Sequence, residues 1–252
     1  MFQNLKTEGL EETQDRLGGG SRFDTDIYAA TIKMAYGGAA QSGAQFMFYE
    51  FDIDGRTYRE TVYVTNRKGE NWFLNPNDQT KKVPLPGFTT AEEIAMFTVE
   101  KPLRELSFED KMVNVYDFEL QKEVPKSMPV AVELIGKTVF LGIQKNLENK
   151  NEKDASGNYQ PTEKEQETNN IVKVFHHDSK LTMVEIRDQQ KKPGDEAAFA
   201  AKWLEANKGK TRDNRKYKGG QGGTSGRPGS APQAGGGSSG GGARQSLFGN
   251  KS

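Results

Sequence analysis

The feature that most limits how this chain can fold is the dipeptide Asp54-Gly55, which separates two β-rich runs. Asp-Gly favours the two-residue type I′ turn of a β-hairpin, because both turn positions need a positive φ. The runs 44–53 and 56–65 are therefore expected to pair as antiparallel strands. Since side chains alternate along a strand, the turn also fixes which residues share a face.

The two faces of this expected hairpin differ in character. One is almost wholly apolar and is the natural core side, with Met47, Tyr49, Phe51, Ile53, Tyr58, Val62 and Val64. The other sets Phe46 opposite Tyr63, Phe48 opposite Thr61, and Glu50 opposite Arg59. A face that mixes aromatic, threonine and charged side chains suits stacking on a ligand better than burial. The alternative is that a second sheet or the C-terminal helix covers it.

Weaker patterns organise the rest of the chain. A strand is expected over 24–36, and the sequence Thr90-Ala91-Glu92-Glu93 has the form of a capping box that starts a helix over 91–100. Short strand content is expected around 112–118, and strands over 130–135, 138–144 and 171–175, the last with a partner at 181–186. Residues 146–170 are expected to form a hydrophilic loop. A C-terminal helix over 196–207 has one apolar face, formed by Phe199, Ala200, Trp203 and Leu204.

The formal net charge of zero hides an asymmetry along the chain. Residues 207–252 carry nine Lys and Arg against the single acid Asp213, which leaves the remainder at −8. This glycine-rich segment is too polar to offset its ordering entropy, so a disordered basic tail is expected over 208–252, after a flexible leader over 1–20 and one domain over 21–207. Either the tail is a solubilising linker, or it is a mobile arm for a polyanion that presents Lys208, Lys210, Arg212, Arg215, Lys216 and Lys218.

Several chemistries have little to draw on in this sequence. There is no cysteine, and no G-x-x-x-x-G-K-[ST] loop for nucleotide phosphates. The only histidines, His176 and His177, are expected to point to opposite faces of a strand, which disfavours a shared metal. Asp52 and Asp54 flank a turn and are expected to shape it rather than to hold catalytic metals. We therefore expect no enzymatic activity, no cofactor and no metal.

The chain has no apolar run near the roughly 18 residues that span a bilayer, and its N-terminus lacks the apolar region of a signal peptide. A soluble protein without membrane contact is expected. The order of three strands, a helix and further strands is typical of a mainly β protein with an OB-fold-like five-stranded Greek-key barrel. In this assignment the helix lies between strands 3 and 4, and a C-terminal helix and the disordered tail follow.

Basic and aromatic residues are interleaved over 56–82, where the local net charge is +3. Aromatic rings stack on any base while neighbouring cations hold the phosphates, so neither contact needs a particular base sequence. The expected stacking residues are Phe46, Phe48, Tyr63 and Trp72, and the expected phosphate contacts are Arg59, Arg67, Lys68, Lys81 and Lys82. Core packing is the alternative role for Tyr58, Trp72 and Phe73.

Four segments carry a resemblance to a known family: Leu17-Gly18-Gly19-Gly20 through Thr65-Asn66-Arg67-Lys68-Gly69-Glu70-Asn71-Trp72-Phe73, then Lys82-Val83-Pro84-Leu85-Pro86-Gly87-Phe88-Thr89-Thr90, then Val113-Asn114-Val115-Tyr116-Asp117, and finally Ser246-Leu247-Phe248-Gly249. Over roughly residues 5–210 and the tip of the tail, the chain resembles bacteriophage single-stranded DNA-binding proteins of the podovirus type. The resemblance is one of the whole chain, since the family has no short diagnostic motif.

This resemblance implies an OB-fold, cooperative or homo-oligomeric coating of single-stranded DNA, and contacts with phage DNA polymerase, helicase or other replication proteins in the host cytoplasm. Many replicative single-strand binding proteins end in an acidic tail that competes for the DNA site. The tail of this chain is basic, so that role does not carry over, and Leu247-Phe248 remains as a short hydrophobic peptide for a partner.

The function expected from the sequence is sequence-tolerant binding of single-stranded DNA in phage DNA replication, recombination or repair. Two alternatives stay open. One is an RNA-binding or RNA-chaperone module that uses the same face. The other is a structural scaffold whose aromatic face binds protein and whose tail is a linker.

Overall fold

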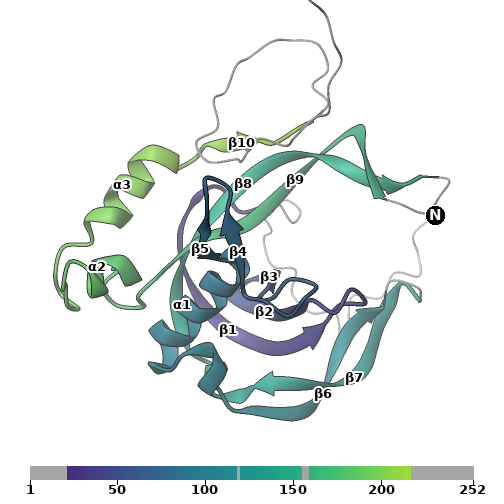
Figure 1. Ribbon diagram of the computed structural model, residues 1–252, viewed down its shortest axis with the longest axis horizontal. Coiled ribbons are helices and arrows are strands. Elements are labelled where there is room, and N and C mark those ends of the chain that lie inside the picture. Colours follow the sequence, from purple (N-terminus) through teal and green to yellow (C-terminus); the bar gives the residue numbers. More distant parts are fainter. Residues whose placement is uncertain (1–21, 118–119, 155–158, 217–252) are drawn as a thin grey trace, which may run out of the picture. The chain divides into compact units, whose positions relative to one another are not determined.

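The computed structural model describes residues 22–117, 120–154 and 159–216 (Figure 1). The expected leader over 1–20 lies outside the described residues, as does the tail from residue 217 onward, including Lys218 and Leu247-Phe248. The described part is mainly β and antiparallel, as expected.

The strands form one large sheet and one small one. In the large sheet the hydrogen-bonded order is β10-β8-β1-β2-β3, with β9 paired to β8, β7 paired to β1, and β6 paired to β7. The small sheet pairs β4 with β5. The bounds of the strands are β1 Asp26–Ala39, β2 Gln45–Ile53, β3 Arg56–Tyr63, β4 Trp72–Asn75, β5 Asp78–Pro84, β6 Phe108–Asp117, β7 Lys122–Ala131, β8 Thr138–Lys153, β9 Tyr159–Phe175 and β10 Thr211–Asp213. The helices are α1 Pro86–Val99, α2 Met183–Arg187 and α3 Ala198–Asn207, with the short 3-10 helices η1 Leu103–Glu105 and η2 Val132–Leu134.

The hairpin at Asp54-Gly55 is confirmed. Both residues have positive φ (51° and 76°), and the Asp52 carboxylate accepts a hydrogen bond from the Gly55 amide at 2.9 Å. The register pairs Phe46 with Tyr63, Phe48 with Thr61 and Glu50 with Arg59. All seven residues of the expected core face are buried, so the turn chemistry identified the strand faces correctly.

Strand β1 has different partners at its two ends. Its first half pairs with β8, from Asp26 opposite Ile143 to Thr31 opposite Thr138, while its second half approaches β7 through Tyr36 opposite Val130. On its other edge β1 pairs with β2, with a register shift between Ile32 and Met34. Figure 1 shows the β6–β7 hairpin diverging from the β8–β9 ribbon.

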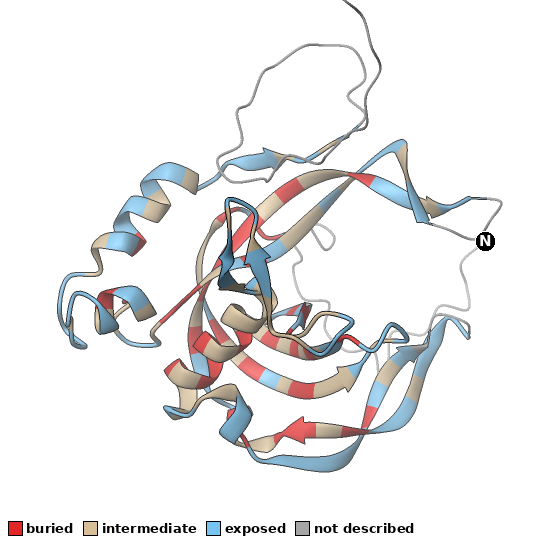
Figure 2. Cartoon of the chain, viewed as in Figure 1, coloured by how far each residue is buried: buried red, intermediate tan, exposed pale blue. Residues whose placement is uncertain are grey.

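This division produces two hydrophobic clusters. The larger lies among β1, β2, β3, β8, β9 and α1, and Figure 2 shows the buried residues concentrated there. The smaller contains the buried residues Tyr36, Val113, Met128 and Val130, with Phe46 and Phe48 packed against it. The β6–β7 hairpin therefore covers part of the β2–β3 face that the sequence predicted to point outward.

Helix α1 starts earlier than expected. Its first turn contains Pro86, whose fixed φ suits that position, and its N-cap residue Leu85 makes no side-chain capping bond. Thr90 does not cap the helix, because its hydroxyl bonds to the carbonyl of Pro86 from inside the helix (3.1 Å). Gly87 packs on β3, where an added Cβ would lie 2.3 Å from the carbonyl oxygen of Tyr63. The predicted capping box is therefore wrong, and close packing of Gly87 places the start of the helix.

The second half of the chain departs further from expectation. Within the predicted loop over 146–170, residues 146–153 belong to β8 and residues 159–170 to β9, so the loop prediction is wrong for them. This ribbon remains polar because it leaves the core, and it is stabilised by cross-strand pairs such as Lys164–Glu152 (2.9 Å). Residues 132–134 form η2, and the predicted strand at 181–186 is replaced by α2. Thr182 and Glu185 form a complete capping box for α2, a signal that the sequence analysis missed.

A closed five-stranded barrel is not found, and no strand pairing joins β3 to β9 within the described residues. Instead Glu60 of β3 accepts a hydrogen bond from the Ile171 amide of β9 at 2.8 Å and another from the Tyr58 hydroxyl. The pKa of Glu60 is raised, because the effect of burial exceeds the opposing effect of these two hydrogen bonds, which lower it. One side chain thus bridges the two strands where backbone pairing would close a barrel.

The C-terminal helix is confirmed as α3, and Gly209 follows it with a φ of +70°. The expected start of the disordered tail at residue 208 is wrong for the described residues 208–216. Thr211–Asp213 forms β10, which pairs parallel with β8. Arg215 then bonds to Asp213 (2.9 Å) and to Glu165 of β9, so this segment is anchored by backbone pairing that its polar composition did not indicate.

We expect Glu60→Ala to lower the free energy of unfolding by about 1–3 kcal/mol, because it leaves the Ile171 amide and the Tyr58 hydroxyl without their acceptor. Glu60→Gln keeps an acceptor oxygen for both donors, so its loss is expected to be smaller than that of Glu60→Ala. Urea unfolding of both variants measures this. Equal losses in the two variants would contradict a bridging role.

Candidate nucleic-acid interface

A long groove runs between the β2–β3 face and the β6–β7 hairpin, with a volume of about 810 Å³. We call it the aromatic trough. Its walls come from strands in the hydrogen-bonded order β3, β2, β1, β7, β6. Its lining residues are Met34, Tyr36, Ala39, Ala40, Gln41, Phe46, Phe48, Glu50, Arg59, Thr61, Tyr63, Met112, Val113, Asn114, Val115, Tyr116 and Glu123.

Four aromatic side chains of the trough are arranged in two pairs. Tyr36 and Phe48 are stacked, with ring centroids 4.6 Å apart and an angle of 22° between the planes. Phe46 and Tyr63 meet edge to face at 6.1 Å. Tyr63 is 51% exposed, whereas Phe46 and Phe48 are half-buried. Of the predicted stacking residues, the structure therefore brings these three into one groove, and Tyr63 is the most accessible.

Gly38 makes room for Phe46. A Cβ at Gly38 would lie 2.4 Å from the tip of the Phe46 ring, closer than real Cβ contacts come. The neighbouring Gly37 is different, because its nearest atom, the Met47 sulfur, would be 3.7 Å from an added Cβ. Phe46 also lines a second cavity of about 730 Å³ on the side of α1, so its ring position affects both spaces.

Among the described residues, Arg59 is the single cation that lines the trough, and it faces two acids there. Its Nε lies 2.6 Å from Glu50, and its Nη1 lies 3.7 Å from Glu123 of β7. Since all three side chains are partly exposed, these ion pairs contribute little to stability and a phosphate can compete for Arg59. The trough thus offers ring faces in its interior and limited positive charge at its wall.

The other predicted contacts lie outside the trough. Trp72, Lys81 and Lys82 are on the β4–β5 hairpin, where the Lys82 ammonium covers the Trp72 ring at 3.8 Å and Lys81 pairs with Asp78 at 3.0 Å. Hydrogen bonds from the Thr80 hydroxyl and from Lys81 hold the pKa of Asp78 below its usual value. Arg67 and Lys68 are exposed in a turn. A hydrogen bond of 3.0 Å from the Gly69 amide to the Asn66 carbonyl closes this turn. The sequence grouping of these residues with Phe46 is therefore not a spatial grouping.

The trough also contains Tyr36, Met112 and Tyr116, which the sequence did not indicate as contacts. Met112 and Tyr116 of β6 are 66% and 49% exposed. The sequence predicted strand content around 112–118. It could not show that these residues share a groove with β2, because that depends on the pairing of β1 with β7.

Most described tail cations already have partners on the domain. Lys208 pairs with Asp26 at 3.0 Å, and the Lys210 ammonium donates to the Ala206 carbonyl at 2.5 Å. Hydrogen bonds to Asp213 and then Glu165 raise the pKa of Arg215. Arg212 and Lys216 are exposed. At the start of the predicted tail, these contacts with the domain therefore leave less positive charge to bind a polyanion.

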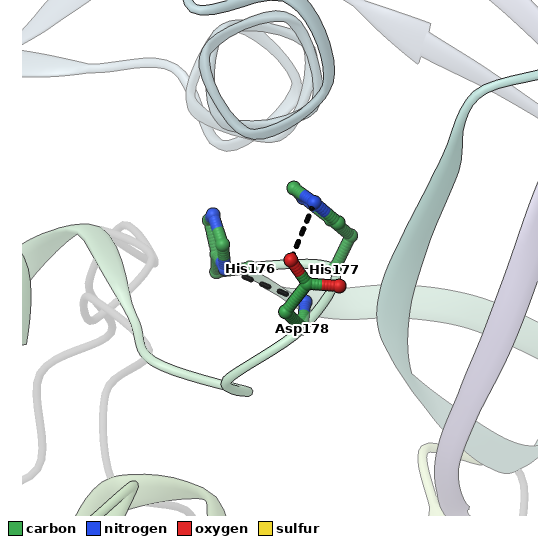
Figure 3. Close-up of side chains that lie close together, drawn as sticks. All are labelled: His176, His177 and Asp178. Atoms are coloured by element: carbon green, nitrogen blue, oxygen red, sulfur yellow. Dashed lines mark hydrogen bonds and ion pairs between the residues drawn. The ribbon is translucent and has the colours of Figure 1, made fainter. Parts of the chain in front are cut away.

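The two histidines do not point to opposite faces of a strand, so this expectation is wrong. Strand β9 ends at Phe175, and His176 and His177 lie in the turn that follows, with ring centroids 4.3 Å apart (Figure 3). Asp178 lies beside them, and its carboxylate is 2.9 Å from Nε2 of His177.

A scan against protein-family models gives no match, and a search of curated proteins finds no relative. Among the described residues, no helix has the length and apolar character needed to cross a membrane.

We expect Gly38→Ala to lower the free energy of unfolding by about 1–3 kcal/mol, because its Cβ displaces the Phe46 ring from its packed position. Gly37→Ala is the matched control, with an expected effect within about 0.5 kcal/mol. Urea unfolding compares the two. If Gly38→Ala is as stable as Gly37→Ala, the ring of Phe46 does not depend on the space above Gly38.

Proposed function

We propose that this chain is a non-enzymatic, sequence-tolerant single-stranded DNA-binding protein and that bases lie in the aromatic trough. The observation that supports this most strongly is the convergence of Tyr36, Phe46, Phe48, Tyr63 and Tyr116 on one groove. Tyr63 and Tyr116 are the accessible rings among them, 51% and 49% exposed, and any base can stack on such a ring, which is worth about 1–3 kcal/mol per base. Bases are accessible for such stacking in a single strand and not in an intact duplex.

The charge distribution favours an orientation with the bases inward and the backbone outward. The acids Glu50 and Glu123 line the trough with Arg59, so phosphates are better placed at the rim and in solvent. There Arg59 exchanges its carboxylate partners for phosphate, and the segment from residue 217 adds Lys218, Arg227, Arg244 and Lys251 with no acid. Non-specific affinity then comes from cations outside the stacking surface.

We propose further that the fold is an open variant of the OB-fold. Strands β1, β2, β3, β8 and β9 take the places of the five barrel strands, and α1 lies between the third and fourth. The Glu60 bridge stands where pairing of β3 with β9 would close the barrel. The trough lies on the β2–β3 face, which is where OB-folds bind oligonucleotides.

The proposed biological setting follows from the resemblance to phage single-strand binding proteins. The chain would coat single-stranded DNA during replication, recombination or repair of a phage genome in the host cytoplasm. Phage polymerase, helicase or other replication proteins, and further copies of the chain on the same strand, are the proposed partners.

We expect Tyr63→Ala and Tyr116→Ala each to weaken binding of a fluorescent oligothymidylate by about 5- to 150-fold, equivalent to about 1–3 kcal/mol per lost stacking contact. Tyr159→Ala is the matched control, since Tyr159 is 66% exposed but lies on β9 outside the trough. Fluorescence anisotropy at low salt measures the affinities. Unchanged binding in the first two variants would contradict a base-stacking trough.

The same assay separates the alternatives. A matched RNA oligonucleotide that binds as tightly as the DNA would favour an RNA-binding module. Absence of binding to either would favour a protein scaffold.

We expect truncation after Lys216 to weaken binding and flatten its salt dependence while leaving a bound state. The removed segment carries four cations and no acid, so the slope of log affinity against log salt should change by no more than about 3. This end point leaves β10 and the Arg215 contacts intact. Complete loss of binding would show that the trough alone does not hold DNA.

A further inference from the structure

We propose that His176, His177 and Asp178 form a binding site for a first-row divalent transition metal ion of the Zn²⁺ class. Their ligand atoms all lie within 4.8 Å of one another (Figure 3). The site rests on these residues alone and does not depend on the proposed binding of DNA.

The turn that carries the three residues is held by its backbone. The amide of His176 donates to the Leu181 carbonyl at 2.9 Å, and the amide of Lys180 donates to the His176 carbonyl at 3.0 Å. Lys180 has a φ of +56°, which lets the chain reverse within these few residues. Three potential ligands are thus presented by one closed turn rather than by a loose loop.

His177 has the hydrogen bond that commonly orients a metal-binding imidazole. Its Nδ1 lies 3.0 Å from the carbonyl oxygen of Phe97, which can only accept, so Nδ1 carries the proton. The lone pair is then on Nε2, the atom that faces Asp178. A backbone carbonyl that fixes the imidazole tautomer in this way is a typical outer contact of a metal ligand.

The Asp178 carboxylate completes a pair of ligands. Its Oδ2 lies 2.9 Å from Nε2 of His177. Two lone pairs at this separation need a positive species between them, either a proton or a metal ion. With an ion about 2.1 Å from each of these two atoms, the angle between the two ligands at the ion would be about 90°. If the two atoms moved apart to roughly 3.4 Å, this angle would become that of a tetrahedral site.

His176 provides the third ligand. Its ring packs edge-on against Phe97, with centroids 5.8 Å apart. Its Nδ1 accepts only long contacts, from the Ser179 hydroxyl at 3.1 Å and from the Asp178 amide at 3.4 Å. These contacts are weak enough for the imidazole to turn toward an ion held by His177 and Asp178.

The surroundings also favour a cation. Phe97 is in the last turn of α1, where the carbonyl groups give the helix end partial negative charge. The side chains of His177 and Asp178 are 40% and 73% exposed, so an ion can enter from solvent and keep water in its remaining positions. Imidazole nitrogens with one carboxylate favour Zn²⁺, Co²⁺, Ni²⁺ or Cu²⁺ over Mg²⁺ or Ca²⁺.

The test is isothermal titration calorimetry, in which ZnCl₂ is added to the full chain. The protein is produced without a histidine tag and stripped of metal with a chelator beforehand. One saturable Zn²⁺ per chain is expected. Loss of a ligand in His177→Ala or Asp178→Asn should weaken binding at least tenfold. Asp188→Asn is the matched control, because Asp188 is another exposed carboxylate that pairs with Arg187 outside the turn.

Nitrogen-15 spectra of the imidazole rings provide a second measurement on the unaltered protein. Because the chain has two histidines and no cysteine, every ring signal belongs to this site. Zn²⁺ should shift Nε2 of His177 while Nδ1 keeps its proton. Absence of saturable binding, unchanged ring nitrogens with excess Zn²⁺, or full affinity in Asp178→Asn would each overturn the proposal and leave a proton as the species between the two residues.

Discussion

The structure depends on the way β1 divides one of its edges between two partners, β8 and β7. Along one edge it pairs with β2, while along the other it pairs first with β8 and then approaches β7. The two partners therefore follow one another along the same edge of β1. The β8–β9 side encloses the main core under α1, and the β7–β6 side bends over the β2–β3 face. The aromatic trough is the space left between that hairpin and that face.

This arrangement separates the surface suited to bases from the charge suited to phosphates. The described residues that line the trough include aromatic rings, one arginine and two acids, whereas Trp72, Lys81 and Lys82 lie on a separate small sheet. Residues 217–252 add four cations and no acid. Affinity in the proposed function is then a sum of short-range stacking and long-range, salt-sensitive attraction. An acidic domain can bind a polyanion under these conditions because the two contributions come from different parts of the chain.

Local chemistry allowed part of this to be predicted. The Asp54-Gly55 turn fixed the register of β2 and β3, and therefore the grouping of Phe46, Phe48 and Tyr63 on one face. The helix α3 was also predicted, but of its expected apolar face Ala200 is buried while Phe199 is 42% exposed. What the sequence could not show were the features set by distant pairing: the cover supplied by β6 and β7, the Glu60 bridge to β9, and the docking of β10 on β8. Polar strands such as the outer part of β9 have no apolar alternation, so they resemble loops until their partner is known.

Photocrosslinking tests most directly whether bases lie in the aromatic trough. A single-stranded oligonucleotide with 5-iodouracil at each position in turn would be crosslinked to the full chain, and the modified residues identified by mass spectrometry. Crosslinks to Tyr63 or Tyr116 are the expected result, since these rings line the trough and are 51% and 49% exposed. Crosslinks confined to Trp72 of the β4–β5 hairpin, or to the segment after residue 216, would contradict it.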